Sequence, residues 1–471
     1  MGESRKLIAG FLALVAALII GGPAIASPVP NDNPWLDQRG ILNMAHQGGE
    51  FEAPSSTMYA FRTALEDRGA DSLELDVNVT SDDRLAVMHD YYTSKITPLD
   101  AQVRDLTLSE LQALDAAWWF SPGTGQFDHS KPEGQYPLRG VRTGLNDPPA
   151  GFTADDFRIP AIEEVLAAFP GVPINIEMKT VPGEPEQSLR VATLLATVLN
   201  RPENRNRPII VASLDQNALV KFNELAPGVG VSASLSSMLA FFGGSTAPLV
   251  PAPVALQVPM ILGELDPPQI LQGMDARDLG YAVHAWTDGA DTENDASYAH
   301  LIESGVQGIM TSSPSLLHDY LCRAGERRPD GSPRCESQIM KYRLGFPSRS
   351  LRQYLKQGLP VKATCDQACT LGLEVRVKPQ EARRLGIRGK PRSIDRGLVL
   401  IGTQRRITGP SAVGTNTFRA NAFRQPFKRL TFARRVTLEI TVNVYDGSGF
   451  KQQVERRWLT LKSRKPLRKG R

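Results

Sequence analysis

The sequence predicts an α/β protein, in which a TIM-type (β/α)8 barrel is followed by a small all-β, sandwich-like domain. Short apolar runs alternate with helix-like segments through the first part of the chain, polar residues gather where several of these runs end, and strand-like runs dominate after residue 360. Repeated strand–helix pairs are typical of a parallel sheet with crossover helices. Eight such pairs in about 290 residues match a barrel, in which active residues gather at the C-terminal ends of the strands.

Nine apolar segments have the length and composition of strands, one more than the barrel needs. They are residues 41–46, 72–79, 85–89, 173–179, 208–213, 229–233, 254–258, 281–287 and 308–311. We interpret 254–258 as the segment outside the barrel. Helical periodicity predicts helices at 57–68, 109–116, 161–169, 185–200, 216–226 and 295–304. The barrel is therefore expected to cover residues 41–320.

An irregular stretch, residues 118–159, interrupts the barrel pattern and is rich in Gly, Pro and aromatic residues. Long loops in a compact domain are usually functional or disordered. Because the stretch precedes the strand that carries Glu177, it is a candidate lid-like insertion over the site. The alternative is that its aromatic residues pack down on the barrel, and both readings stay open.

The N-terminus, residues 1–26, has the features of a secretory signal peptide. Arg5 and Lys6 precede an apolar run that ends at Ile20, and a small-residue cleavage site follows it. An uncleaved anchor is the alternative, but the run is shorter than the roughly 20 residues that span a bilayer. We therefore expect a secreted, extracellular protein, with the cell wall as a candidate location, and an N-terminal lead-in at residues 27–40.

The chain has four cysteines, Cys322, Cys335, Cys365 and Cys369, all outside the predicted signal peptide. An even count in an exported chain favours disulfides over metal or redox use. Three pairings are open. We favour the sequence neighbours, Cys322 with Cys335 and Cys365 with Cys369.

The net charge of +4 hides a strong asymmetry. Residues 341–471 hold 31 Lys and Arg against 7 Asp and Glu, a net charge of +24, which leaves −20 for residues 1–340. This asymmetry predicts two domains with different partners. We expect a linker at residues 321–359, a basic β-sandwich-like domain at 360–462 and a basic tail at 463–471.

A strongly basic, exported domain would bind polyanions by an attraction that salt weakens. The candidate partners of residues 341–471 are an anionic cell-wall polymer such as teichoic acid, an anionic membrane surface, and nucleic acid without specific recognition. The alternative is a soluble basic spacer, or a partner for the acidic barrel within the same chain.

Three carboxylates occupy the polar faces of two predicted strands. Side chains alternate between the faces of a strand, so Glu74 and Asp76 project together, and Glu177 and Lys179 share a face of their own strand. Clustered carboxylates repel unless one is protonated or a cation lies between them. Three oxygen donors suit Ca²⁺ or Mg²⁺ better than zinc, so we expect a divalent cation. A solvated strand face is the alternative.

Two histidines, His46 and His89, each end a strand-like run and enter a loop. Such a histidine is positioned for proton transfer. A single histidine of this kind is more often structural. Two of them beside three carboxylates indicate an acid–base pair.

Several separated motifs then carry a resemblance to a known family. They are Ala45 to Gly48, Ala60-Phe61, Gly69 to Asp71, Leu73 to Val77, Val87 to Asp90, Ile159-Pro160, Glu163 to Leu166, Asn175 to Lys179 and Trp286-Thr287. On these motifs the chain resembles the glycerophosphodiester phosphodiesterase family over roughly residues 41–318. The resemblance implies a barrel that uses a divalent metal to hydrolyse glycerophosphodiesters to glycerol 3-phosphate and an alcohol.

The resemblance also implies a role for each matching residue. The metal ligands are Glu74, Asp76 and Glu177. The acid and the base, in either order, are His46 and His89. The substrate or phosphate contacts are Gln47, Lys179 and Trp286. For Trp286 the alternative is a packed barrel residue.

Three departures from the family pattern concern residues near the site. Gln47 stands where the family usually has Arg, which removes a charge from the phosphate contact. Pro54-Ser55-Ser56-Thr57 replaces Pro-Glu-Asn-Thr and loses a carboxylate, which Glu50 or Glu52 could replace. Thr311 lacks the Asp that commonly follows it, a change that we interpret as structural.

The sequence therefore predicts a secreted, metal-dependent phosphodiesterase whose substrate is a glycerophosphodiester. One alternative is a lysophospholipase D, which needs an apolar groove for an acyl chain. The other is a cell-wall or polyanion-binding protein that has lost catalysis. Against this second alternative, the implied metal ligands, both histidines and Lys179 are all present.

Overall fold

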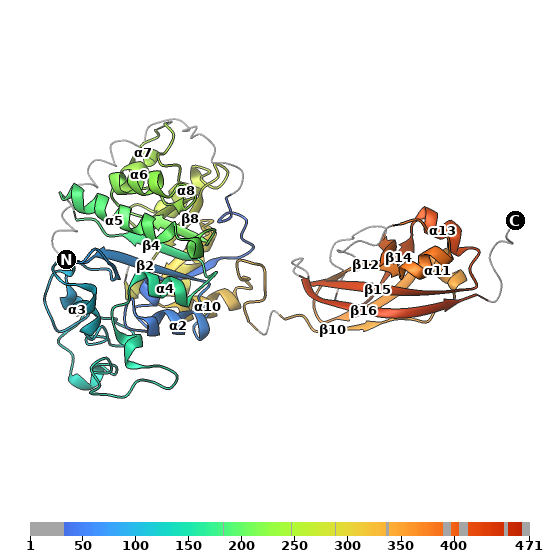
Figure 1. Ribbon diagram of the computed structural model, residues 1–471, viewed down its shortest axis with the longest axis horizontal. Coiled ribbons are helices and arrows are strands. Elements are labelled where there is room, and N and C mark those ends of the chain that lie inside the picture. Colours follow the sequence, from blue (N-terminus) through green and yellow to red (C-terminus); the bar gives the residue numbers. More distant parts are fainter. Residues whose placement is uncertain are drawn as a thin grey trace. The chain divides into compact units, whose positions relative to one another are not determined.

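The computed structural model describes residues 33–181, 183–245, 247–287, 289–335, 339–389, 397–404, 413–446 and 451–463. The predicted signal peptide and all of the predicted tail except Ser463 lie outside these residues. The chain forms two compact units, with the boundary between Asp330 and Gly331 in the sequence. Figure 1 shows both units.

The first unit contains a parallel barrel. Its strands run in the order β6-β5-β4-β2-β1-β9-β8-β7, and a parallel bridge from Ser232 to Ala255 joins the two ends of this series. The strands are β1 (Leu42–Ala45), β2 (Ser72–Val79), β4 (Ile174–Met178), β5 (Ile209–Ala212), β6 (Gly230–Val231), β7 (Ala255–Pro259), β8 (Ala282–Trp286) and β9 (Gly308–Thr311). The predicted TIM-type barrel is confirmed.

The extra strand is β3 (Leu85–Val87), so the prediction that residues 254–258 lie outside the barrel is wrong. β3 pairs with β2 in antiparallel fashion, whereas β7 pairs in parallel with β8. The connection from β2 to β3 consists only of Thr80 to Arg84. A parallel crossover needs about a dozen residues or more, so this short connection can only fold back as a hairpin.

Helices surround the barrel strands (Figure 1). They are α2 (Met58–Glu66), α3 (Leu108–Ala113), α4 (Ile162–Ala168), α5 (Pro185–Leu199), α6 (Gln216–Leu225), α7 (Leu235–Phe242), α8 (Pro267–Gly273), α9 (Asp295–Glu303) and α10 (Pro314–Arg323). Side chains that cap the first turn begin several of them, such as Thr57 before α2 and Asp215 before α6. The sequence-based prediction missed α7, α8 and α10.

The main core of the barrel unit lies between the sheet and its helices. Leu73, Leu75 and Val77 of β2 pack there with helix residues such as Val191 and Phe222. These three strand residues therefore face outward, toward the helices. Because side chains alternate along a strand, the polar residues between them face the inside of the barrel.

The second unit is a small antiparallel β domain, as the sequence predicts, but its described strands form one sheet instead of the two sheets of a sandwich. Its strands join in one continuous sheet of order β10-β11-β14-β13-β12-β15-β16. They are β10 (Tyr342–Gly345), β11 (Leu359–Cys365), β12 (Cys369–Val377), β13 (Val399–Gln404), β14 (Gly414–Ala422), β15 (Arg435–Asp446) and β16 (Lys451–Lys462). The helices are α11 (Leu351–Gln357), α12 (Pro379–Arg384) and α13 (Arg424–Leu430).

One hydrophobic core joins this sheet to its helices. Leu373 and Ile440 of the central strands share it with Tyr354 of α11 and Leu430 of α13. The predicted linker, residues 321–359, is therefore wrong in its second half, because β10 and α11 belong to the folded second unit.

The predicted disulfide between Cys365 and Cys369 is confirmed. It joins the end of β11 to the start of β12. Cys322 and Cys335 are disulfide-bonded as well. Among the described residues, the helices are too short or too polar to cross a membrane.

Candidate active site

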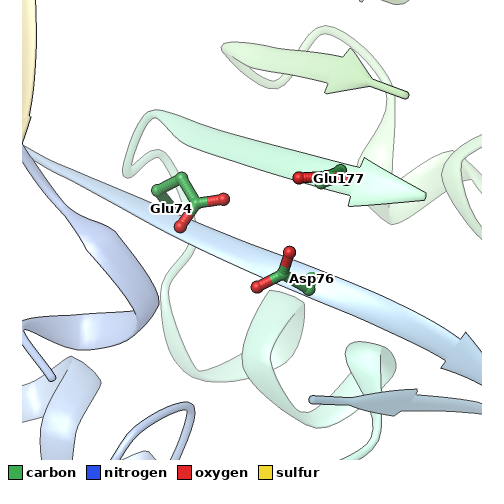
Figure 2. Close-up of side chains that lie close together, drawn as sticks. All are labelled: Glu74, Asp76 and Glu177. Carbon is green, nitrogen blue, oxygen red and sulfur yellow. The ribbon is translucent and has the colours of Figure 1, made fainter. Parts of the chain in front are cut away.

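Three carboxylates meet on the inner side of β2 and β4 (Figure 2). Glu74 and Asp76 lie on β2, and Glu177 of β4 is the register partner of Asp76. One carboxylate oxygen of each residue lies within 4.8 Å of the corresponding oxygens of the other two. The structure thus brings together the three residues that were predicted to bind a metal.

The donor atoms of this cluster fit a divalent cation. Asp76 Oδ2 is buried and accepts no hydrogen bond from the described residues. Burial and the charge of Asp76 raise the pKa of Glu74 to about 8, because crowded carboxylates resist ionisation. A hard cation with oxygen ligands would balance the negative charge and use the free lone pairs.

Lys179 follows β4 directly and lies against two of the carboxylates. Its Nζ atom is 3.3 Å from Asp76 Oδ1 and 3.2 Å from Glu177 Oε1. Burial opposes the ammonium charge, but these two carboxylates outweigh burial and raise the pKa of Lys179. The side chain is therefore a fixed cation beside the carboxylate cluster, where it can contact a phosphoryl oxygen.

His46 follows β1 and begins the short 3-10 helix η1 (His46–Gly48). Its Nδ1 atom is 3.0 Å from Glu50 Oε1, and its Nε2 atom is 3.9 Å from Glu74 Oε2. Burial opposes protonation, but the hydrogen bond to Glu50 and the charge of Glu74 raise the pKa of His46 to about 9. Glu50 therefore orients the ring so that Nε2 faces the carboxylate cluster.

His89 lies after β3 and contacts Lys179. Its Nδ1 atom is 2.6 Å from Asp90 Oδ1, and its Nε2 atom is 3.2 Å from Lys179 Nζ. An ammonium can only donate, so Nε2 accepts from Lys179 and Nδ1 carries the proton that is shared with Asp90. Burial disfavours the Asp90 carboxylate, but the hydrogen bond with His89 and the charge of Lys95 lower the pKa of Asp90 to about 2.

Each histidine thus has a carboxylate at its Nδ1 atom, Glu50 for His46 and Asp90 for His89. Lys95 lies near both carboxylates. Its Nζ atom lies 3.8 Å from Glu50 Oε2 and 3.7 Å from Asp90 Oδ2. Sequence reasoning assigned no role to Asp90 or Lys95. The position of Asp90 beside His89 is a signal that could have identified it, whereas Lys95 ends the three-residue 3-10 helix η2 (Thr93–Lys95), which is too short to show a periodic pattern.

Gln47 is buried, and neighbouring residues engage its side chain. Its Oε1 atom accepts a hydrogen bond from Ser55 Oγ at 2.6 Å, and its Nε2 atom is 3.4 Å from His46 Nε2. Its backbone N–H donates to Glu74 Oε2 at 3.1 Å. Gln47 therefore connects His46 and the candidate metal ligand Glu74 to the loop that contains Ser55. The predicted phosphate contact of Gln47 stays a prediction.

Trp286 lies at the C-terminal end of β8, the end at which the other site residues also lie. It is partly buried and packs with interior barrel residues that include Leu42, Met44 and Met310. This packing fits the alternative interpretation of Trp286 as a packed barrel residue. Its stacking on a substrate stays a prediction.

The aromatic residues of the insertion pack against one another and against a cation. The Arg139 guanidinium lies 4.0 Å from the ring centroid of Tyr136 and 4.8 Å from those of Trp118 and Trp119. His129 stacks on Trp119 with 4.3 Å between ring centroids. These aromatic residues therefore form a cluster within the insertion, and the lid-like role of residues 118–159 stays a prediction.

The insertion also supports the loop that carries Glu50. Gln126 is buried, accepts a hydrogen bond from the Ser55 N–H at 2.8 Å and donates one to the Ala116 carbonyl at 2.7 Å. The Phe51 carbonyl accepts a hydrogen bond from the Gly123 N–H at 2.7 Å. Residues far apart in the sequence therefore fix the position of the carboxylate that orients His46.

The parallel barrel, the carboxylate cluster, the buried ammonium and the two supported histidines define a barrel hydrolase that acts on a phosphate ester. Comparison with known proteins gives the family within that class. Residues 46–316 match the Glycerophosphoryl diester phosphodiesterase family. The chain belongs to this family and is a phosphodiesterase.

Curated relatives agree with the family match. The chain is 28% identical over 294 residues to a glycerophosphodiester phosphodiesterase of Bacillus subtilis (strain 168), which covers 59% of this chain and 85% of the relative. It is 24% identical over 306 residues to the human lysophospholipase D GDPD1, with the same two coverages, 59% and 85%. A solved phosphodiesterase of Oleispira antarctica, in complex with sn-glycerol-3-phosphate, is 19% identical with a TM-score of 0.44, covering 61% of this chain and 98% of that chain.

Proposed function

We propose that this phosphodiesterase hydrolyses glycerophosphodiesters to glycerol 3-phosphate and an alcohol, with Ca²⁺ or Mg²⁺ as its metal. One observation carries the proposal. Each histidine has its Nδ1 atom on a carboxylate, while Nε2 of His46 faces Glu74 and Nε2 of His89 faces Lys179. Two proton-transfer atoms thus flank a site for a metal and a phosphate. The Bacillus subtilis relative is named for this activity, which supports the substrate class.

The proposed metal follows from the donor atoms. Glu74, Asp76 and Glu177 offer only carboxylate oxygens, which Ca²⁺ and Mg²⁺ prefer over softer ligands. When bound, the cation would polarise a phosphoryl oxygen and offset the negative charge that develops during hydrolysis.

The side chains perform the remaining steps. Lys179 binds a phosphoryl oxygen through its ammonium group. One histidine accepts a proton at Nε2 from the attacking hydroxyl, and the other donates a proton from Nε2 to the leaving oxygen. Glu50 and Asp90 hold the rings in place and stabilise the imidazolium form. The attacking oxygen belongs either to water or to the 2-hydroxyl of the glycerol. Only attack by the 2-hydroxyl gives a cyclic phosphate.

The test is hydrolysis of glycerophosphocholine by the purified full-length protein. We expect glycerol 3-phosphate to form, a chelator to stop its release and added Ca²⁺ or Mg²⁺ to restore it. His46→Ala should lower kcat by about 10²-fold or more. His300→Ala is the matched control, because His300 lies on α9 and pairs with Asp266 rather than with a site residue. Turnover that is unaffected by both the chelator and His46→Ala would contradict the proposal.

A second candidate function is lysophospholipase D activity. The human relative that bears this name supports it. Lysophosphatidylcholine should therefore be assayed beside glycerophosphocholine under the same conditions. Hydrolysis of the lysolipid alone would favour the second candidate, and hydrolysis of neither substrate would favour a binding protein without catalysis.

We also propose that the chain is exported and that residues 341–471 contact an anionic partner outside the cell. The signal-like N-terminus and the net charge of +24 support this. N-terminal sequencing of the protein from culture medium should then give a start near Ser27. Retention of Met1 to Ala26 in a protein found only inside the cell would contradict export.

A further inference from the structure

One segment of the second unit combines exposed phenylalanines with exposed cations. This α13 segment, residues 423–435, comprises Phe423, helix α13, the turn that follows it and the first residue of β15. Phe423, Phe427 and Phe432 are 40%, 39% and 46% exposed. They are three of the six large apolar side chains that are exposed in the described part of this unit. Such a concentration of exposed apolar surface marks a site of interaction.

Other residues of the segment hold it on the core, so the three rings are not needed there. Pro426 and Leu430 of α13 are buried, and Leu430 packs with the strands of the sheet. The Phe427 N–H donates to the Phe423 carbonyl at 2.8 Å, which places these two residues one helical turn apart. Residues four apart are neighbours on a helix surface, so their rings belong to one exposed patch.

The same segment carries positive charge. The segment has five exposed cationic side chains and no Asp or Glu. The cationic residues are Arg424, Lys428, Arg429, Arg434 and Arg435. The patch is therefore both apolar and strongly cationic.

We propose that the α13 segment binds the surface of an anionic lipid bilayer. A bilayer offers negative headgroups for the five cations and an apolar layer into which the phenylalanine rings can enter. An anionic polymer offers only the charge, so it leaves the three exposed rings without a role. This inference narrows the anionic partner proposed above to a membrane, and it requires no step of the barrel's chemistry.

The test is co-sedimentation of the full-length protein with lipid vesicles. Vesicles of equal parts phosphatidylglycerol and phosphatidylcholine should bind the protein, whereas vesicles of phosphatidylcholine alone should bind it at least about tenfold more weakly. The triple variant Phe423→Ser, Phe427→Ser, Phe432→Ser should lose about tenfold or more in affinity for the anionic vesicles. Leu145→Ser is the matched control, because Leu145 is 72% exposed on the barrel unit.

A second measurement reports insertion and needs only one substitution. Tryptophan fluorescence of Phe427→Trp should shift to the blue on anionic vesicles and be quenched by brominated acyl chains. The fluorescence of Leu145→Trp, measured the same way, should show neither change beyond that of the unaltered protein.

The outcomes separate this inference from the proposed function. Hydrolysis of soluble glycerophosphocholine should be equal in the unaltered protein and in the triple variant, so loss of the enzyme activity and loss of membrane binding are distinguishable. Vesicle binding that the triple variant retains in full would overturn the inference. Binding to soluble teichoic acid, without any binding to anionic vesicles, would also overturn it and favour a polymer partner.

Discussion

The two units of this chain arrange charge in opposite ways. In the barrel, carboxylates from separate strands converge on one place, with ligand atoms within 4.8 Å of one another. In the second unit, the cations of the α13 segment are all exposed. Buried charges interact strongly, whereas water and salt screen exposed ones. A single barrel charge should therefore matter greatly, and a single cation of the α13 segment should matter little.

The largest effect is expected at the carboxylate cluster. Asp76→Asn keeps the shape of the side chain but removes one of the two carboxylate charges that contact Lys179. We expect kcat/KM to fall by about 10³-fold or more, since both the metal and the position of Lys179 depend on this charge. Steady-state hydrolysis of glycerophosphocholine measures kcat/KM, and isothermal titration with Ca²⁺ and Mg²⁺ measures the metal affinity.

The control for Asp76→Asn is Glu303→Gln, which removes an exposed carboxylate from the same unit. Its kcat/KM and metal affinity should match those of the unaltered protein. An Asp76→Asn enzyme that keeps its metal affinity would show that the barrel charges do not act together, and the contrast between the two units would then fail.

The next effect is expected at His284, inside the barrel. Burial lowers the pKa of His284 to about 4, and its Nε2 atom has no hydrogen-bond partner among the described residues. The unfolded chain therefore binds a proton between pH 6.5 and about 4 that the folded protein excludes, so the histidine destabilises the fold as pH falls through this range. Over this range the histidine lowers the free energy of unfolding by about 3 kcal/mol.

Urea unfolding of the unaltered protein and of His284→Met, followed by circular dichroism, tests this expectation. The difference between their free energies of unfolding should change by about 3 kcal/mol from pH 7 to pH 4, because Met has no proton to gain. Comparing the two proteins removes the contributions of other titrating groups. A constant difference across this pH range would show that His284 is already solvated in the folded state.

A smaller effect is expected at Lys95, which connects the supports of the two histidines. Lys95→Met keeps the aliphatic stem but leaves Glu50 and Asp90 without their shared cation. We expect kcat to fall by about tenfold with little change in KM, because the rings lose orientation while the phosphate contacts remain. Lys95→Arg should restore most of the activity, and this rescue distinguishes a positioning role from general damage to the fold.

Lys221→Met is the control for Lys95→Met, since Lys221 is a partly exposed lysine that pairs with Glu224 of the same helix and with no site residue. A Lys95→Met enzyme with the kcat of this control would show that each histidine is held independently.

The barrel could be predicted from the sequence because its strands are regular. The alternation of Leu73, Leu75 and Val77 with the carboxylates of β2 was sufficient to predict which side chains share a face. Composition did not show that β3 is the strand outside the barrel, because Leu85 to Val87 is as apolar as a barrel strand. The length of the connection before it carried the missing information, since the short stretch after Val79 excludes a parallel crossover.

The site was predictable only where residues lie on strands or next to them. Glu74, Asp76 and Glu177 converge as their strand positions require. Lys95 lies in the short 3-10 helix η2 and Gln126 in a loop. The path of such irregular segments depends on tertiary contacts that the local sequence pattern does not encode. In the second unit, α11 lay hidden in a predicted linker, although Ser350 and Gln353 form a capping box that marks its start.

The smallest effect is expected from the cations of the α13 segment, and it completes the comparison between the units. The triple variant Arg424→Gln, Lys428→Gln, Arg429→Gln should change the free energy of unfolding by no more than about 0.5 kcal/mol per site, since these side chains are exposed. Any change should favour the folded state, because a unit with a net charge of +24 repels itself. Urea unfolding at low ionic strength measures this change in the free energy of unfolding. A loss of stability well above this range would mean that the cations hold the fold, and they would then have a structural role in place of a free surface for a membrane.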